Sequence, residues 1–152
     1  MSYNTYSYSG YNTYREIGVK TASQGKLVVM LYEGAVSHLA DALALVDEDN
    51  KVPANKIESF VGHIQKVQDI ITELQVSLDM EKGGEIAKNL MALYIYFNKE
   101  LLNASISHDR KKLQFVHEMM SKLSETWADV SATQANGAVK MSTASSTISI
   151  TG

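Results

Sequence analysis

The chain has 152 residues, no cysteine and a formal net charge of −3. This length allows one domain with its own core, and the missing cysteines exclude disulfides and thiolate metal sites. The small net charge and the absence of lysine or arginine runs argue against a nucleic-acid partner. Residues 1–25 lack a signal-peptide pattern, and no apolar run reaches the roughly 20 residues that cross a bilayer, so we expect a cytoplasmic protein without membrane insertion.

A tyrosine-rich arm is expected over residues 1–20. Its first 14 residues carry no charged side chain and hold five of the eight tyrosines. Tyrosine combines a large ring with a polar tip, so this arm could dock weakly on an apolar surface. The simpler interpretation is a solvated arm.

A helical bundle is predicted over residues 21–131. Thr21 and Gln24 fit a capping box at the start of the first helix, and Pro53 suits the first turn of the second. Gly83 and Gly84 break the chain before the third. The predicted helices span about 22–46, 53–79, 84–106 and 109–131.

Seven-residue apolar spacing marks the second and fourth helices. The second repeats Ile57, Ile64, Ile71 and Leu78 against Phe60, Val67 and Leu74, and the fourth repeats Leu113, Met120 and Trp127 against Val116, Leu123 and Val130. This spacing and the short links predict an all-α, antiparallel four-helix bundle. Residues 132–152 carry one charge and become rich in serine and threonine, so we expect a disordered tail there.

The first and third helices carry more apolar surface than a bundle needs. In the first, Leu27, Leu31, Ala35, Leu39 and Leu43 form the core stripe, and further apolar residues extend it to about half the circumference. In the third, a second apolar shoulder of Met91, Ile95, Leu102 and Ile106 stands beside the core stripe of Ile86, Leu90, Leu93, Phe97 and Leu101. A bundle helix usually needs an apolar stripe of about 100°, so we expect the additional apolar surface to be buried by another segment or molecule.

Three alternatives could bury this additional apolar surface: another segment of the chain, a second copy in a homodimeric structural or adaptor bundle, or a partner helix in a groove. For the groove, the residues that we expect to contact the partner are the apolar shoulder residues and tyrosines of the first and third helices. They are Val29, Tyr32, Val36, Met91, Tyr94, Ile95, Tyr96 and Leu102.

Catalytic and metal-binding motifs are missing from the sequence. None of the four histidines follows a glutamate by three residues, as bundle di-metal sites require, and no phosphate-binding loop or nucleophile elbow occurs. His38 falls in the apolar arc of the first helix, where a hydrogen-bonded buried histidine is more common than a ligand. We therefore expect no enzyme activity, no cofactor and no metal.

Several blocks of this sequence together resemble the FliS family of flagellar export chaperones. Residues 21–35 are similar to its first-helix signature, and residues 68–74 with 77–87 to its second. The third-helix pattern is carried by Asn89-Leu90, Leu93-Tyr94, Tyr96 and Asn103-Ala104, and Trp127 falls where the family often has a tryptophan. The resemblance spans about residues 11–131.

The resemblance implies a small helical bundle without enzymatic activity that binds the disordered C-terminal segment of flagellin in the cytoplasm. It implies that binding prevents premature polymerisation and helps deliver the subunit to the flagellar type III export apparatus, with an export-gate protein as a further partner. It also implies that an N-terminal cap covers part of the flagellin groove, here with Tyr11, Tyr14 and Ile17.

Two features depart from the family pattern. The family commonly has proline where this chain has Gln24, which should still support the helix start. Residues 1–10 and the tail after Ala132 have no firm counterpart, and no role is assigned to them.

Overall fold

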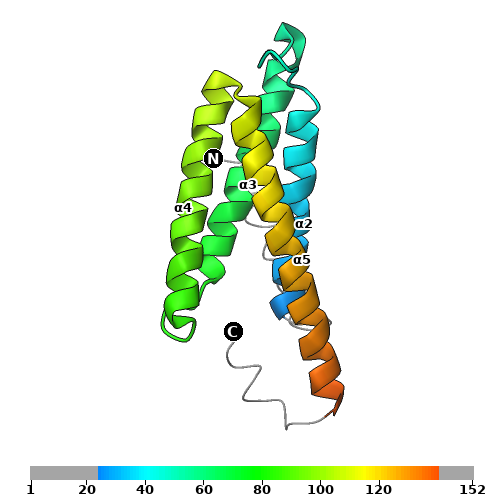
Figure 1. The fold of residues 1–152 in the computed structure, drawn as a ribbon, viewed down its shortest axis with the longest axis vertical. Helices are drawn as coiled ribbons and strands as arrows, with labels where there is room; N and C mark the ends of the chain where they lie inside the picture. Colours follow the sequence, from blue (N-terminus) through cyan, green and yellow to red (C-terminus); the bar gives the residue numbers. More distant parts are fainter. Residues whose placement is uncertain (1–23, 141–152) are drawn as a thin grey trace, which may run out of the picture.

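The computed structural model describes the backbone of residues 24–140 and the side chains of residues 24–132. In this part of the chain the elements are α2 (Gln24–Leu43), the 3-10 turn η1 (Ala54–Lys56), α3 (Ile57–Ser77), α4 (Gly84–Ser107) and α5 (Arg110–Lys140). The four long helices run alternately up and down (Figure 1). This arrangement confirms the predicted all-α, antiparallel four-helix bundle.

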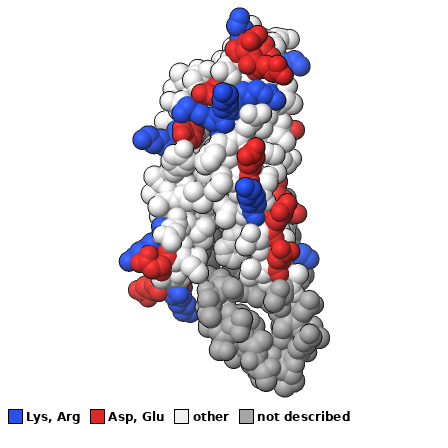
Figure 2. All heavy atoms as spheres, in the orientation of Figure 1, with Lys and Arg blue, Asp and Glu red and all other residues white. Residues whose placement is uncertain are grey.

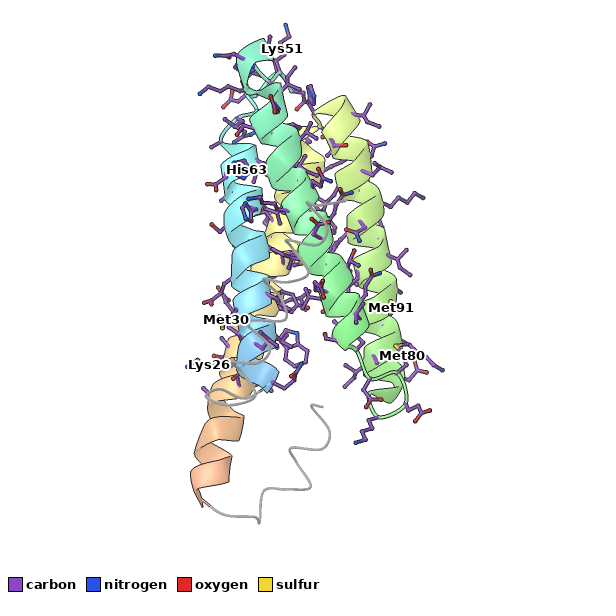
Figure 3. The ribbon with its side chains drawn as sticks, turned by 180° about the vertical axis from the view of Figure 1, so that it is seen from behind. Lys26, Met30, Lys51, His63, Met80 and Met91 are labelled. Atoms are coloured by element: carbon purple, nitrogen blue, oxygen red, sulfur yellow. The ribbon has the colours of Figure 1, made fainter. Side chains whose placement is uncertain are left out.

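The helices follow one another around the bundle in chain order. α2 packs extensively against α3 and α5, and α4 packs over smaller areas against the same two neighbours. α2 and α4 are therefore diagonal to each other, as are α3 and α5. Figure 3, seen from behind, shows α3 between α2 and α4.

The core contains the heptad positions that the sequence predicts. Phe60, Ile64, Val67, Ile71 and Leu74 of α3 and Leu113, Val116 and Met120 of α5 are buried. Two expected core residues are exposed instead, Ile57 and Ile86. Each lies in the first turn of its helix, at an end of the bundle where neighbouring helices cover less of its surface, and Ala87 takes the buried position in α4.

Arg110 joins the end of α2 to the start of α5. Its Nη1 donates to the carbonyl of Leu43 at 2.8 Å and to that of Val46, and its backbone N–H donates to Asn50 Oδ1 at 3.0 Å. A guanidinium at a helix C-terminus satisfies carbonyls that have no partner within the helix. α2 ends at Leu43, three residues before its expected end, because the next residues form tighter turns that Arg110 caps.

Pro53 was predicted in the first turn of the second helix, but it precedes the 3-10 turn η1, and α3 begins four residues after it. The carbonyl of Pro53 accepts a hydrogen bond from the Lys56 N–H at 2.8 Å, which closes the 3-10 turn, and α3 begins at Ile57. Short 3-10 turns are common at helix starts.

Gly83 and Gly84 open α4 as predicted. The N–H of Gly83 donates to the Asp79 carbonyl at 2.8 Å, while Asp79 Oδ1 accepts from the N–H groups of Glu81 and Lys82. Gly84 has a φ of +53°, which a residue with a side chain rarely adopts. The turn therefore requires glycine for its backbone conformation.

α5 continues to Lys140, nine residues past its expected end at 131. The predicted tail of 132–152 is thus helical in its first part. Alanine is the best helix former, and an existing helix grows without a new nucleation step, so Ala132, Ala135 and Ala138 favour the extension of α5. Residues 1–23 and 141–152 lie outside the described part, which includes the predicted arm and the rest of the predicted tail.

Candidate functional site

An apolar stripe runs along the outside of α4. We call Met91, Ile95, Leu102 and Ile106 the α4 stripe. Their spacing of four, seven and four residues places them on one side of the helix. Ile95, Leu102 and Ile106 are 56, 58 and 77% exposed. The predicted second shoulder of this helix is therefore present, and no described segment covers these three side chains.

The α4 stripe borders α3. Ile95 and Leu102 lie one turn before and one turn after Asn98, whose carbonyl accepts a hydrogen bond from Gln68 Nε2 of α3 at 3.5 Å. Figure 3 shows the stripe residue Met91 where α4 runs beside α3. The bundle therefore presents these residues along the shared face of α3 and α4.

Two exposed residues of α3 extend this face, Ile57 and Val61. Val61 lies seven residues before Gln68, on the same side of α3. Because α3 and α4 are antiparallel, moving seven residues back along α3 from Gln68 corresponds to moving about seven residues forward along α4 from Asn98. Val61 therefore lies beside the part of α4 between Leu102 and Ile106. The sequence pattern did not predict either residue as part of a binding surface, and the heptad spacing predicted Ile57 to be a core residue. The sequence does hold a hint for Val61: it directly follows the core residue Phe60, and an apolar residue at that position faces away from the core seam.

Charged side chains are sparse along the middle of α4. Residues 89–98 contain none, and Figure 2 shows the charges on the α4 and α5 face gathered mainly toward its ends and along α5. Lys88 and Lys99 border this uncharged stretch on the same side of α4. The apolar part between them can bind a partner at little desolvation cost.

Tyr96 points toward α5 instead of joining the stripe. It is 43% exposed, donates a hydrogen bond to Glu100 Oε1 at 2.9 Å and meets the Phe115 ring edge-on. Lys112 Nζ donates to Glu100 Oε2 at 3.1 Å. These two bonds, Lys112 first, lower the pKa of Glu100, and the bond to the carboxylate raises the pKa of Tyr96. The site candidates on α4 therefore divide between two sides of the helix.

Tyr32 and Tyr94 are core residues. They are 0 and 1% exposed, and their hydroxyls bond to each other across the bundle between the diagonal helices α2 and α4. The Trp127 indole also lies near the Tyr32 hydroxyl and acts to lower its pKa, against the larger effect of burial. Burial raises the pKa of both phenols, so both stay neutral. The prediction that these two tyrosines contact a partner is therefore wrong, because neither side chain reaches the surface.

The apolar surplus of α2 has a different explanation. Val29 and Val36 are half-buried, and Val36 packs against the core. α2 makes extensive contacts with two neighbours, so it needs a wider apolar arc than one seam provides. Since α2 and α4 are diagonal, the two shoulders belong to separate surfaces. The expected cap residues Tyr11, Tyr14 and Ile17 lie outside the described residues.

His38 meets a second histidine between α2 and α3. Its Nδ1 lies 3.0 Å from Nδ1 of His63, and Asp41 Oδ2 lies 4.0 Å from the same His63 nitrogen. Burial first, then Lys66 and His63, lower the pKa of His38, with Asp41 acting in the opposite direction. The sequence predicted a hydrogen-bonded histidine at 38. It did not indicate the cluster, because the motif typical of bundle metal sites is glutamate-x-x-histidine. This cluster instead combines His38-x-x-Asp41 with a histidine from the next helix.

Comparison with known proteins places the chain in a family. Residues 7–134 match the sequence profile described as "Flagellar protein FliS". The chain belongs to the FliS family. The "Flagellar secretion chaperone FliS" of Salmonella typhimurium is 32% identical over 130 residues, which are 83% of this chain and 93% of that protein. The protein of the same name from Escherichia coli is 33% identical over 128 residues, 82% of this chain and 90% of its own.

A more distant relative carries the same name. The "Flagellar secretion chaperone FliS" of Bacillus subtilis is 27% identical over 117 residues, which are 77% of this chain and 82% of that protein. FliS is a chaperone family and not an enzyme family, in agreement with the prediction of no catalytic activity. None of the described helices is both long and apolar enough to span a bilayer.

Proposed function

We propose that this protein is a cytoplasmic export chaperone that binds the disordered C-terminal segment of flagellin. Membership of the FliS family, whose relatives are named flagellar secretion chaperones, supports the class of function. The observation that carries the proposed site is the α4 stripe, where Ile95, Leu102 and Ile106 are exposed on a helix whose opposite side is core.

Binding would couple to folding of the client. A disordered segment loses chain entropy when it becomes helical, so net affinity requires a large apolar contact. An amphipathic client helix can place apolar anchors one turn apart against the α4 stripe and against Ile57 and Val61 of α3. The rigid core beneath the stripe means that the chaperone pays little to order its own surface.

The consequences for the client follow from occupancy of that surface. Flagellin held by its C-terminal segment cannot use that segment to polymerise prematurely, and the complex can be delivered to the flagellar type III export apparatus, where an export-gate protein is a further partner. We also propose that the cap residues Tyr11, Tyr14 and Ile17 occupy part of the client surface in the free chaperone. An uncovered apolar surface favours aggregation, and a cap would limit it.

Calorimetric titration with the C-terminal segment of flagellin from the same organism tests the proposal. The expected result is a 1:1 complex with a large favourable enthalpy and a negative heat-capacity change. Replacing both Ile95 and Leu102 with aspartate should abolish binding while helix content is retained, because both side chains already lie in solvent.

Met30→Asp is the matched control. Met30 is 42% exposed and lies on α2, diagonal to α4, so its replacement should leave the affinity unchanged. Intact samples that give no heat and no complex would refute the flagellin client. Stable dimers at low micromolar concentration, unaffected by flagellin and broken by the Ile95 and Leu102 changes, would assign the stripe to a homodimer instead.

A further inference from the structure

Three potential metal ligands converge between α2 and α3. His38 and Asp41 lie one turn apart on α2, and His63 comes from α3. Their ligand atoms, two imidazole nitrogens and a carboxylate oxygen, all lie within 4.8 Å of one another. Figure 3 shows His63 where α3 faces α2.

The distances suit a first-row transition metal. Zinc bonds to imidazole nitrogen and carboxylate oxygen are about 2.0–2.2 Å long, which places neighbouring ligand atoms roughly 3–4 Å apart. The two Nδ1 atoms are 3.0 Å apart, and His63 Nδ1 is 4.0 Å from Asp41 Oδ2. Small side-chain rotations would therefore bring all three atoms to one ion.

The surroundings leave room for an ion to enter. Both histidines are half-buried and Asp41 is exposed, so one side of the cluster opens to solvent, where water can complete the coordination. Lys66 acts electrostatically on His38 and opposes a cation, whereas Asp41 favours one. Because Lys66 acts on His38 more strongly than Asp41 does, charge alone does not attract a cation here, and binding depends on nitrogen ligation, which zinc and similar metals prefer and calcium or magnesium do not.

We propose that His38, Asp41 and His63 bind a divalent transition-metal ion of the zinc class that cross-links α2 and α3. The ion bonds to Nδ1 of each histidine and to one oxygen of Asp41. Its effect is to hold together two helices that would otherwise be joined at this level by packing and one histidine–histidine contact. The site is independent of the client surface, which lies on the α3 and α4 face.

Zinc titration of the full-length protein tests the proposal. The protein should carry no added histidines and should be stripped with a chelator before zinc chloride is titrated calorimetrically. We expect one zinc ion per chain and a rise in the thermal midpoint with excess zinc, because an ion that binds only the folded state stabilises it. Visible absorption of the cobalt-loaded protein gives a second, spectroscopic readout.

His63→Gln and His38→Gln should each weaken zinc binding by at least about tenfold and remove the rise in thermal midpoint, since each deletes a direct ligand. Asp41→Asn should weaken binding less, because a neutral amide oxygen still ligates poorly. His117→Gln is the matched control, as His117 is half-buried on α5, and it should change neither readout. Circular dichroism checks that each variant is folded. If His38→Gln does not fold, the zinc affinity of His63→Gln decides the test.

Three results would overturn the proposal. If the stripped protein takes up no stoichiometric zinc, the cluster is only a pair of histidines sharing one proton. If His117→Gln weakens binding as much as His63→Gln, the ion binds elsewhere. A thermal midpoint that zinc does not change would refute the cross-link between the helices.

Discussion

Tyr32 and Tyr94 form a polar contact at the centre of an apolar core. Each hydroxyl is buried, so each needs a partner to offset its lost hydration. The two hydroxyls bond to each other, but the Trp127 indole acts only on Tyr32, where it acts to lower the pKa against the larger effect of burial. The two tyrosines are therefore unequal members of the pair.

Replacing these tyrosines one at a time should lower the free energy of unfolding by different amounts. Tyr32→Phe leaves the Tyr94 hydroxyl without its partner and removes the polar group beside the Trp127 indole, and we expect it to lower the free energy of unfolding by about 1–3 kcal/mol. Tyr94→Phe leaves the Tyr32 hydroxyl with the Trp127 indole nearby and should cost less. Urea unfolding of both variants measures the difference.

The double Phe variant is the control, because it removes both hydroxyls and should cost less than the sum of the single changes. Equal costs for the two single variants, or a larger cost for Tyr94→Phe, would show that Trp127 does not support Tyr32.

These tyrosines also show what the sequence could not predict about the site. An apolar wheel placed Tyr32 and Tyr94 at the edge of a shoulder, and their polar tips made a surface role reasonable. Their burial depends on the hydroxyls finding each other across diagonal helices, 62 positions apart in the chain. No local pattern indicates that partnership. Ile95 and Leu102 were predictable because their surplus over the core stripe is a property of one helix.

At the level of elements, the α3–α4 turn depends on the absence of a side chain at Gly83. A Cβ atom there would lie 2.5 Å from the Ala87 Cβ and 2.8 Å from the Asp79 carbonyl oxygen. Real Cβ atoms do not approach other atoms so closely, and both neighbours are fixed, one in the core and one in the turn backbone.

Gly83→Ala should therefore destabilise the protein by about 1–3 kcal/mol, as overpacking does elsewhere. Gly62→Ala is the matched control, since Gly62 lies inside α3 with no atom within 4 Å of an added Cβ. We expect that change to stabilise by roughly 0.5–1 kcal/mol, because alanine favours the helix. Thermal unfolding of both variants tests the pair, and a tolerated Gly83→Ala would mean that the turn can shift.

The helices themselves were largely predictable from sequence, and their ends were less so. Heptads of β-branched and aliphatic residues identified α3 and α5, and the double glycine located the start of α4. The end of α2 was misplaced because it depends on Arg110, which is 67 residues from Leu43 in the chain and had been assigned only to a segment end. The predicted end of α5 was too early, because the nearly uncharged composition after residue 131 indicated disorder. The alanines in that stretch instead favour a helix.

On the scale of the whole molecule, the proposed cap predicts an effect of the N-terminal residues on affinity. Deleting residues 1–17 removes Tyr11, Tyr14 and Ile17, and should raise the apparent affinity for the flagellin segment several-fold. A cap that occupies the client surface part of the time reduces affinity by the uncapped fraction. Calorimetric titration of the truncated protein measures the change.

Deleting only residues 1–9 is the control, because it keeps all three cap residues and should leave the affinity unchanged. Equal affinities for the full-length and both truncated proteins would show that the arm does not compete with the client.

The large contact between α2 and α5 has a consequence during synthesis. α2 leaves the ribosome first among the described helices, but α5, which covers much of its apolar arc, follows only after α3 and α4. At typical elongation rates that interval is on the order of several seconds, many times longer than a helix needs to form. α3 can cover its share of α2 soon after it is made, but the part of the apolar arc of α2 that packs against α5 stays uncovered until α5 has been synthesised. A protein proposed to shield another chain from premature contacts thus passes through the same exposed state while it is being made.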